Sequence, residues 1–177
     1  VGKNVRPFRM EPEEDLNLYL PAVGSREALE NRGTMRGYST FWCADVRGFG
    51  ESRWLTSEYL DLADYGPDYL VHAHHVMYGE SLLGRRVFDV LRCMQALRAE
   101  GAKHFHLVGE GHGAVLALLT AVLDDTVETV SLKKGPVSFE ELVHQPACEW
   151  PSSLFAYNVL RNFDLPELRE FLGKRLA

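Results

Sequence analysis

The chain has 177 residues, of which 46% are hydrophobic and 25% charged. This balance is typical of a globular domain and excludes a disordered or fibrous chain. The formal net charge of −6 at pH 7 provides no general basic surface to neutralise phosphates, so nucleic-acid binding is not expected. No run approaches the ~18 apolar residues of a membrane helix, and no signal peptide is visible. We therefore expect one cytoplasmic domain over residues 1–177, without a membrane partner.

The three cysteines, Cys43, Cys93 and Cys148, lie far apart in the sequence. An odd number of cysteines without C-x-x-C spacing disfavours a disulfide framework and a cysteine zinc site. We expect buried or partly buried free thiols in a reducing compartment.

Strand-like and helix-like patterns alternate along the chain after an irregular segment over residues 1–24. Such alternation indicates a parallel sheet with right-handed crossovers. We therefore predict the α/β class, as a three-layer αβα arrangement with a mostly parallel sheet. In chain order, the expected elements are a short helix over 26–31 capped by Ser25, a strand over 38–45, helices over 68–78 and 83–100 (the second capped by Ser81), a strand over 104–108, a buried helix over 114–123, a strand over 127–132, a short helix opened by Ser138, and apolar segments over 154–160 and 165–172.

Two turns follow predicted strands, where ligands of parallel α/β sheets bind. Residues 45–52 read DVRGFGES, and residues 109–113 read GEGHG and open a helix. The second turn has the context of a nucleophile elbow, G-x-S-x-G, whose flanking glycines allow a tight turn and close packing of the helix on the sheet. The centre of the elbow is Gly111 in this chain.

These turns, together with YGESLLGRRVFD over residues 78–89, resemble the α/β-hydrolase fold of acetyl xylan esterase-like and related esterases. The resemblance covers about residues 37–172. It implies hydrolysis of a small carboxylic ester by Ser, Asp or Glu, and His, in that chain order, without a cofactor. It also implies that the backbone N–H of His112 belongs to the oxyanion hole.

The chain departs from this pattern in two ways. Gly111 has no side chain to form an acyl-enzyme, and only His144 follows the last predicted strand. We interpret the chain as a truncated α/β-hydrolase fold. Because loss of the nucleophile costs on the order of 10⁶ in rate, ordinary triad catalysis is not expected. The remaining candidate catalytic residues are Glu110, as a base acting on water, together with His112 and Ser52.

The histidines suggest a different chemistry. Asp68, His72 and His75 share one face of a predicted helix, and His104 and His106 point to the same side of a predicted strand. Two imidazoles and a carboxylate can bind a divalent metal ion such as non-haem iron or zinc. The alternative interpretation is an amphipathic helix with exposed or hydrogen-bonded imidazoles.

Several charged side chains have simpler interpretations. Arg85 and Arg86 are expected to pair with Asp89 or Glu80 at the surface, where an ion pair contributes little to stability. Arg47, in the first of the two turns, is expected to brace loops rather than to bind a substrate.

Three functions therefore stay open: an esterase-related protein that has lost triad catalysis, a metal-dependent enzyme performing hydrolysis or oxygen chemistry, and a non-catalytic oligomeric binding module. A sheet that stops early exposes an edge strand and an apolar face. We therefore expect a homodimer or a higher homo-oligomer.

Overall fold

The computed structural model of the protein describes residues 15–21, 41–54 and 66–177. The helix expected over 26–31 with its Ser25 cap lies outside these residues. The strands are β1 (Asp15–Leu20), β2 (Trp42–Cys43), β3 (His104–Glu110) and β4 (Val127–Lys133). The α-helices are α2 (Gly66–Met77), α3 (Leu82–Ala99), α4 (His112–Leu123), α5 (Phe139–His144) and α6 (Leu165–Leu172), with 3₁₀ turns at Gly50–Ser52, Ser152–Leu154, Val159–Arg161 and Gly173–Arg175.

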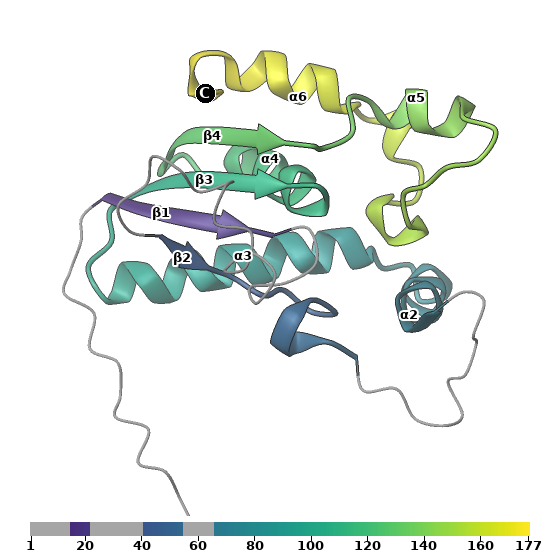
Figure 1. The fold of residues 1–177 in the computed structure, drawn as a ribbon, viewed down its shortest axis with the longest axis horizontal. Helices are drawn as coiled ribbons and strands as arrows, with labels where there is room; N and C mark the ends of the chain where they lie inside the picture. Colours follow the sequence, from purple (N-terminus) through teal and green to yellow (C-terminus); the bar gives the residue numbers. More distant parts are fainter. Residues whose placement is uncertain (1–14, 22–40, 55–65) are drawn as a thin grey trace, which may run out of the picture.

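The four strands form one sheet in the order β2-β1-β3-β4, and every pair is parallel. The chain reaches β3 from β2 through α2 and α3, and it reaches β4 from β3 through α4 (Figure 1). The predicted α/β class is confirmed, and the helices that pack on the parallel sheet are consistent with a three-layer fold.

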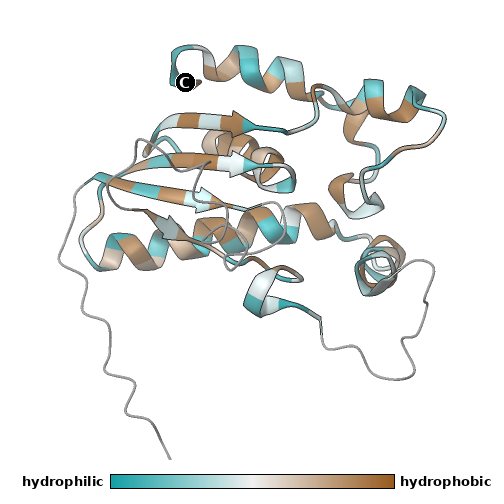
Figure 2. Ribbon diagram, viewed as in Figure 1, coloured by the Kyte–Doolittle hydropathy of each residue, from teal (hydrophilic) through white to brown (hydrophobic). Residues whose placement is uncertain are grey.

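One face of the sheet forms the hydrophobic core with α3 and α4. Leu16, Leu18, Phe105 and Leu107 are all at most 1% exposed and belong to one cluster with the apolar residues of these helices. Burial of each such side chain contributes about 1.5–3 kcal/mol. Because side chains alternate along a strand, the polar residues of the same strands lie on the opposite face, so that brown and teal segments alternate in Figure 2.

Strand β1 corrects the expectation that residues 1–24 are irregular. Leu16, Leu18 and Leu20 are buried and alternate with other residues such as the half-buried Asn17. This period of two is that of a strand, and β1 lies inside the sheet between β2 and β3. Pro21 follows directly, where its missing N–H costs no ladder hydrogen bond.

The strand expected over 38–45 is shorter than predicted within the described residues. Only Trp42 and Cys43 form it, paired with Leu18 and Tyr19 of β1. Both residues are half-buried, because β2 lies at the edge of the described sheet. A near-continuous apolar run such as residues 38–45 predicts a strand covered on both faces, and this prediction is wrong for these two residues.

The helix caps agree well with the sequence. Ser81 Oγ accepts the Gly84 N–H at 3.0 Å at the start of α3, and Ser138 Oγ accepts the Glu141 N–H at 3.1 Å at the start of α5. The capping box of α6 was not predicted. Its N-cap, Asp164, also accepts hydrogen bonds from Ser138 Oγ and from the first turn of α5, and so fixes α5 to α6.

All three cysteines are free thiols. Cys43 and Cys93 are half-buried as expected, whereas Cys148 is exposed. Burial raises the pKa of Cys43 to about 12, so this thiol stays protonated and unreactive at neutral pH. No helix among residues 66–177 is long and apolar enough to cross a membrane.

Candidate functional site

The turn between β3 and α4 has an unusual backbone conformation. Gly111, the N-cap of α4, has φ 57° and ψ −118°, a conformation that only glycine adopts without strain. Its N–H donates to the Lys133 carbonyl at 2.9 Å, and its own carbonyl accepts the Ala114 N–H at 3.1 Å. The sharp strand-to-helix turn expected from GEGHG is therefore present at the carboxyl end of β3.

The two flanking glycines allow α4 to pack directly on the backbone of the sheet. A Cβ atom on Gly113 would lie 1.9 Å from the carbonyl oxygen of Leu20, at the end of β1. A Cβ atom on Gly109 would lie 2.3 Å from the carbonyl oxygen of Gly113. Neither distance leaves room for a side chain, so both glycines are required for the close contact predicted from the sequence.

His112, the residue after the centre of the elbow, packs between two aromatic rings. Its ring centroid lies 5.5 Å from that of Phe49 and 5.7 Å from that of Trp150. Burial, with a smaller effect of the Arg86 charge, lowers the pKa of His112 to about 4. Its buried Nε2 has no hydrogen-bond partner among the described residues. The imidazole is therefore neutral at pH 7 and offers a polar atom in an aromatic environment.

The low pKa of His112 predicts that the fold loses stability on mild acidification. An unfolded histidine has a pKa near 6.5, so between pH 6.5 and about 4 the unfolded chain binds a proton that the folded chain does not. The free energy of unfolding should fall by about 1.5 kcal/mol between pH 6.5 and 5. Urea denaturation at several pH values measures this slope, which His112→Gln should reduce. Burial also lowers the pKa of His72, so the slope of His72→Gln shows how much of the pH dependence comes from that residue. Equal slopes in the wild type and His112→Gln would contradict the prediction.

Arg86 does not lie at the surface, where it was expected. It is only 2% exposed, and its guanidinium forms an ion pair with Asp68. It also donates to Ser153 Oγ at 3.0 Å and to the Arg47 carbonyl at 3.1 Å, and it lies 4.5 Å above the Phe49 ring. A buried cation therefore joins α2, α3, the loop after β2 and the segment after α5.

The partners of Arg86 set the charge of the site. Burial opposes ionisation of Asp68, but hydrogen bonding to Ser153 and the charge of Arg86 hold the pKa of this carboxyl below its usual value. The neighbouring Arg85 behaves as expected and pairs with Glu80 at 2.5 Å on the surface. For Arg86, the expected pairing with Asp89 or Glu80 is wrong, because its side chain points into the core.

The loop over 45–52 is held by its own side chains. Arg47 makes hydrogen bonds of 2.7 and 2.5 Å to the carboxylate of Asp89, which confirms its expected bracing role. Ser52 Oγ donates to the Asp45 carbonyl at 3.2 Å. Both Ser52 and Arg47 line a cavity of about 440 Å³ together with Trp54. Ser52, a candidate catalytic residue, thus makes a turn hydrogen bond beside this cavity.

Glu110 and His112 flank Gly111 but have different surroundings. The carboxylate of Glu110 accepts hydrogen bonds from the Tyr19 hydroxyl at 2.8 Å and from Lys134 Nζ at 2.7 Å. These partners come from β1 and from the residue after β4, whereas His112 packs on Phe49 and Trp150. Both carboxylate oxygens of Glu110 are thus occupied, which disfavours its use as a base.

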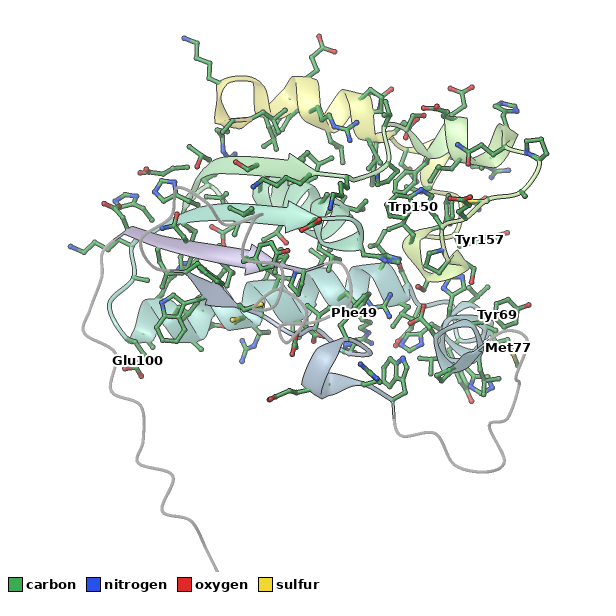
Figure 3. The ribbon with its side chains drawn as sticks, in the orientation of Figure 1. Phe49, Tyr69, Met77, Glu100, Trp150 and Tyr157 are labelled. Atoms are coloured by element: carbon green, nitrogen blue, oxygen red, sulfur yellow. The ribbon has the colours of Figure 1, made fainter. Side chains whose placement is uncertain are left out.

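Trp150, which packs on His112, also forms part of the wall of a larger cavity of about 570 Å³. His112 itself is not among the residues that line it. The segment after α5 carries Trp150 and Tyr157 at the same end of the molecule as α2 (Figure 3). His72 of α2 also lines the cavity, and its buried Nδ1 has no hydrogen-bond partner within the described part of the chain. This volume is that of a small-molecule site.

The metal site expected on α2 is not assembled. Asp68 pairs with Arg86, and His75 Nδ1 donates to the Val71 carbonyl at 2.8 Å. Within residues 15–21, 41–54 and 66–177, a single group of three His, Cys, Asp or Glu side chains has its ligand atoms within 4.8 Å of one another, and it contains neither Asp68, His72 nor His75. On this helix, His75 is therefore hydrogen-bonded and His74 is exposed, as the alternative interpretation expects, whereas the buried Nδ1 of His72 has no partner among the described residues.

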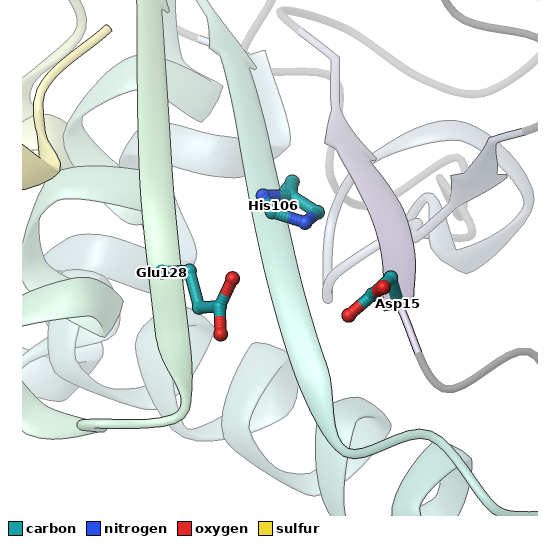
Figure 4. A group of neighbouring side chains, drawn as sticks. All are labelled: Asp15, His106 and Glu128. Atoms are coloured by element: carbon teal, nitrogen blue, oxygen red, sulfur yellow. The ribbon is translucent and has the colours of Figure 1, made fainter.

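That single group consists of Asp15, His106 and Glu128 (Figure 4). His106 is one of the two expected metal ligands of β3. His104, the other one, lies with its Nδ1 2.7 Å from Glu128 Oε1. Sequence reasoning missed Asp15 and Glu128, because the three residues come from three different strands.

No protein-family model matches the chain, and no curated protein matches it. Its function is therefore inferred from the chemistry of the two regions described above.

Proposed function

We propose that the chain is an α/β-hydrolase-like protein that binds a small ester, or the carboxylate derived from it, at the elbow without forming an acyl-enzyme. The observation that carries this proposal is the conformation of Gly111, at φ 57° and ψ −118° between β3 and α4. A tight turn of this kind, directly after a strand and before a helix, is the backbone feature on which esterases place their nucleophile.

The first turn of α4 is suited to an oxygen atom of partial negative charge. The first N–H groups of a helix have no acceptors within the helix, and the helix dipole favours negative charge at this end. The N–H of His112 belongs to this turn. The cavity lined by Trp150 and His72, which shares Trp150 with the surroundings of His112, has room for the remainder of a small ligand.

The side chains that are present support the proposal of binding without turnover. Gly111 supplies no nucleophile, Ser52 Oγ donates to a backbone carbonyl of its own turn, and Glu110 is held by Tyr19 and Lys134. The neutral His112 packs between aromatic rings. A serine hydrolase without its nucleophile loses activity on the order of 10⁶-fold.

Calorimetric titration of the full chain with phenyl acetate and with acetate tests the proposal. We expect saturable binding that His72→Leu weakens, because this variant removes a polar side chain from the wall of the cavity. His74→Leu is the matched control, since His74 is an exposed residue of α2. Absence of saturable binding, or equal affinity in both variants, would overturn the proposal. Steady hydrolysis of an aryl acetate by the wild type would contradict the argument against an acyl-enzyme.

Self-association is the partner prediction that accompanies this function. The edge of β4 is partly covered, because the Ala177 N–H donates to the Val130 carbonyl at 2.9 Å. Large apolar side chains are exposed elsewhere: Met77 is 78% exposed, Tyr78 81% and Tyr157 78%. We expect a homodimer that buries this surface. Light scattering at micromolar concentration should give twice the chain mass, and Met77→Lys should shift it towards the monomer. A monomeric wild type would contradict this expectation.

A metal-dependent activity remains the second candidate function. The observation that favours it is the group formed by Asp15, His106 and Glu128, which lies at the other end of the strands from the elbow.

A further inference from the structure

The group of Asp15, His106 and Glu128 lies at the amino end of three adjacent parallel strands. Asp15 begins β1, His106 is the third residue of β3, and Glu128 is the second residue of β4. Their side chains lie on the polar face of the sheet, opposite the leucines of the core. The elbow at Gly111 follows the carboxyl end of β3, so the two sites are separate.

An irregularity in the pairing of β3 with β4 brings Glu128 into this group. Phe105 pairs with Val127 and His106 pairs with Thr129, so Glu128 is an extra residue without a partner on β3. Val127 is fully buried, and so is Val130, three residues later, although regular alternation would place these two on opposite faces. Such bulges re-aim side chains and are frequent beside functional sites.

Neighbouring polar groups hold two of the three side chains in place. His106 Nδ1 is hydrogen-bonded to Thr129 Oγ1 at 2.8 Å, which leaves Nε2 to bind a ligand. His104 Nδ1 lies 2.7 Å from Glu128 Oε1 and leaves the second oxygen of this carboxylate available. Such outer partners are the means by which proteins orient metal ligands.

The donor set and the spacing indicate which ligand fits. The ligand atoms of the three residues all lie within 4.8 Å of one another. Donors bound to one zinc ion at about 2.0–2.2 Å are up to roughly 4 Å apart. Small movements of the three side chains would therefore bring their ligand atoms to the distances that one ion requires. Two carboxylates at this separation repel each other, and a dication relieves the repulsion. One imidazole with two carboxylates favours a first-row transition metal over Mg²⁺ or Ca²⁺, which prefer oxygen ligands.

We propose that Asp15, His106 and Glu128 bind one divalent transition-metal ion, preferentially Zn²⁺, with Thr129 and His104 as positioning residues. Three protein ligands leave at least one coordination position open to water. The ion links β1, β3 and β4 at the end of the sheet that the elbow does not use. The site is independent of the proposed ester binding and is tested separately from it.

Calorimetric titration of Zn²⁺ into the full chain, purified without an affinity tag and stripped of metal, provides the test. We expect one strong site per chain, lost in His106→Gln and weakened in Asp15→Asn and Glu128→Gln. These two carboxylates are exposed, so their variants should fold. Thr129→Val should weaken binding by about tenfold, the lower end of the range for an outer-sphere partner. Ser131→Ala, at the next position of β4 on the same face, is the matched control and should bind as the wild type does.

Thermal unfolding gives a second readout that does not depend on activity. Because the ion binds the folded chain and bridges three strands, Zn²⁺ should raise the Tm of the wild type and of Ser131→Ala, but not that of His106→Gln. Binding retained in His106→Gln and lost in His75→Gln would assign the ion to α2 and overturn the proposal. The absence of a strong site in the wild type would overturn it as well.

Discussion

Replacing Asp68 with alanine is expected to destabilise the fold by about 3 kcal/mol, because it leaves the guanidinium of Arg86 buried without its counter-charge. Arg86 is 2% exposed and cannot reach water without opening the core. The effect stays at the low end of the range for such pairs, because Ser153 and the Arg47 carbonyl still accept its other hydrogen bonds. Urea denaturation at pH 7 measures the loss.

The chain offers a matched control one residue away. Arg85 pairs with Glu80 in the same way, but this pair is exposed to solvent. Glu80→Ala should therefore leave the midpoint of urea unfolding nearly unchanged. A double variant, Asp68→Asn with Arg86→Met, removes both charges and should recover part of the loss. Equal effects of Asp68→Ala and Glu80→Ala would show that Arg86 is solvated in solution.

The cost of Asp68→Ala should also depend on pH. The pKa of Asp68 is lower in the folded chain than its usual value, so its ionised form stabilises the fold at any pH above about 3.9, the value in an unfolded chain. This contribution disappears as the pH falls through the lower, folded-state value. The difference between the wild type and Asp68→Ala should therefore be full at pH 6 and decrease below pH 4. A constant difference across this range would contradict the assignment of the ion pair.

Gly113→Ala is expected to destabilise the fold by about 3 kcal/mol or more, the upper end of the range for overpacking. The new Cβ would lie 1.9 Å from the Leu20 carbonyl oxygen and 2.6 Å from its carbon. These are backbone atoms at the end of β1, an interior strand of the sheet, so α4 has to move away from β1. The midpoint of thermal unfolding measures the effect, and loss of ester binding should accompany it because the elbow shifts with the helix.

Gly84→Ala is the matched control, for which we expect a change in stability of the opposite sign. Gly84 also lies within a helix, and its Cβ would meet only the Ser81 side chain, at 3.4 Å. Alanine is favoured over glycine in a helix by about 0.8–1.0 kcal/mol, so Gly84→Ala should stabilise the fold slightly. Helix propensity alone predicts a gain for both substitutions. A stabilised Gly113→Ala would therefore contradict the close packing of α4 on β1.

The sequence predicted the elements whose pattern is local. The apolar positions of α3 recur at helical spacing, Ser81 and Ser138 stand where caps are needed, and GEGHG carries the glycines of a tight turn. The position of Arg86 was open to prediction as well. It lies three residues after Leu83 and four before Val90, on the buried face of α3, although an arginine is rarely buried without a partner.

Other features depend on contacts between distant segments and were not predictable in this way. The alternating leucines of β1 predict a strand, but nothing local shows that this strand lies inside the sheet. The group of Asp15, His106 and Glu128 forms only because β1, β3 and β4 are parallel neighbours whose amino ends lie together. The bulge at Glu128 shifts the pairing by one residue. Its trace in the sequence of β4 is the three-residue spacing of Val127 and Val130, which does not show which residue is extra or what it meets.

Strand β3 carries one candidate site at each of its ends. His106 and Gly111 are five positions apart along the chain, which corresponds to about 17 Å at the rise of a strand. A paramagnetic ion such as Mn²⁺ at the amino end would therefore broaden the NMR signals of a ligand at the elbow to a degree set by that distance. Because β3 fixes the distance between the two sites, binding of the metal ion at one end and of the ligand at the other can be measured in a single sample.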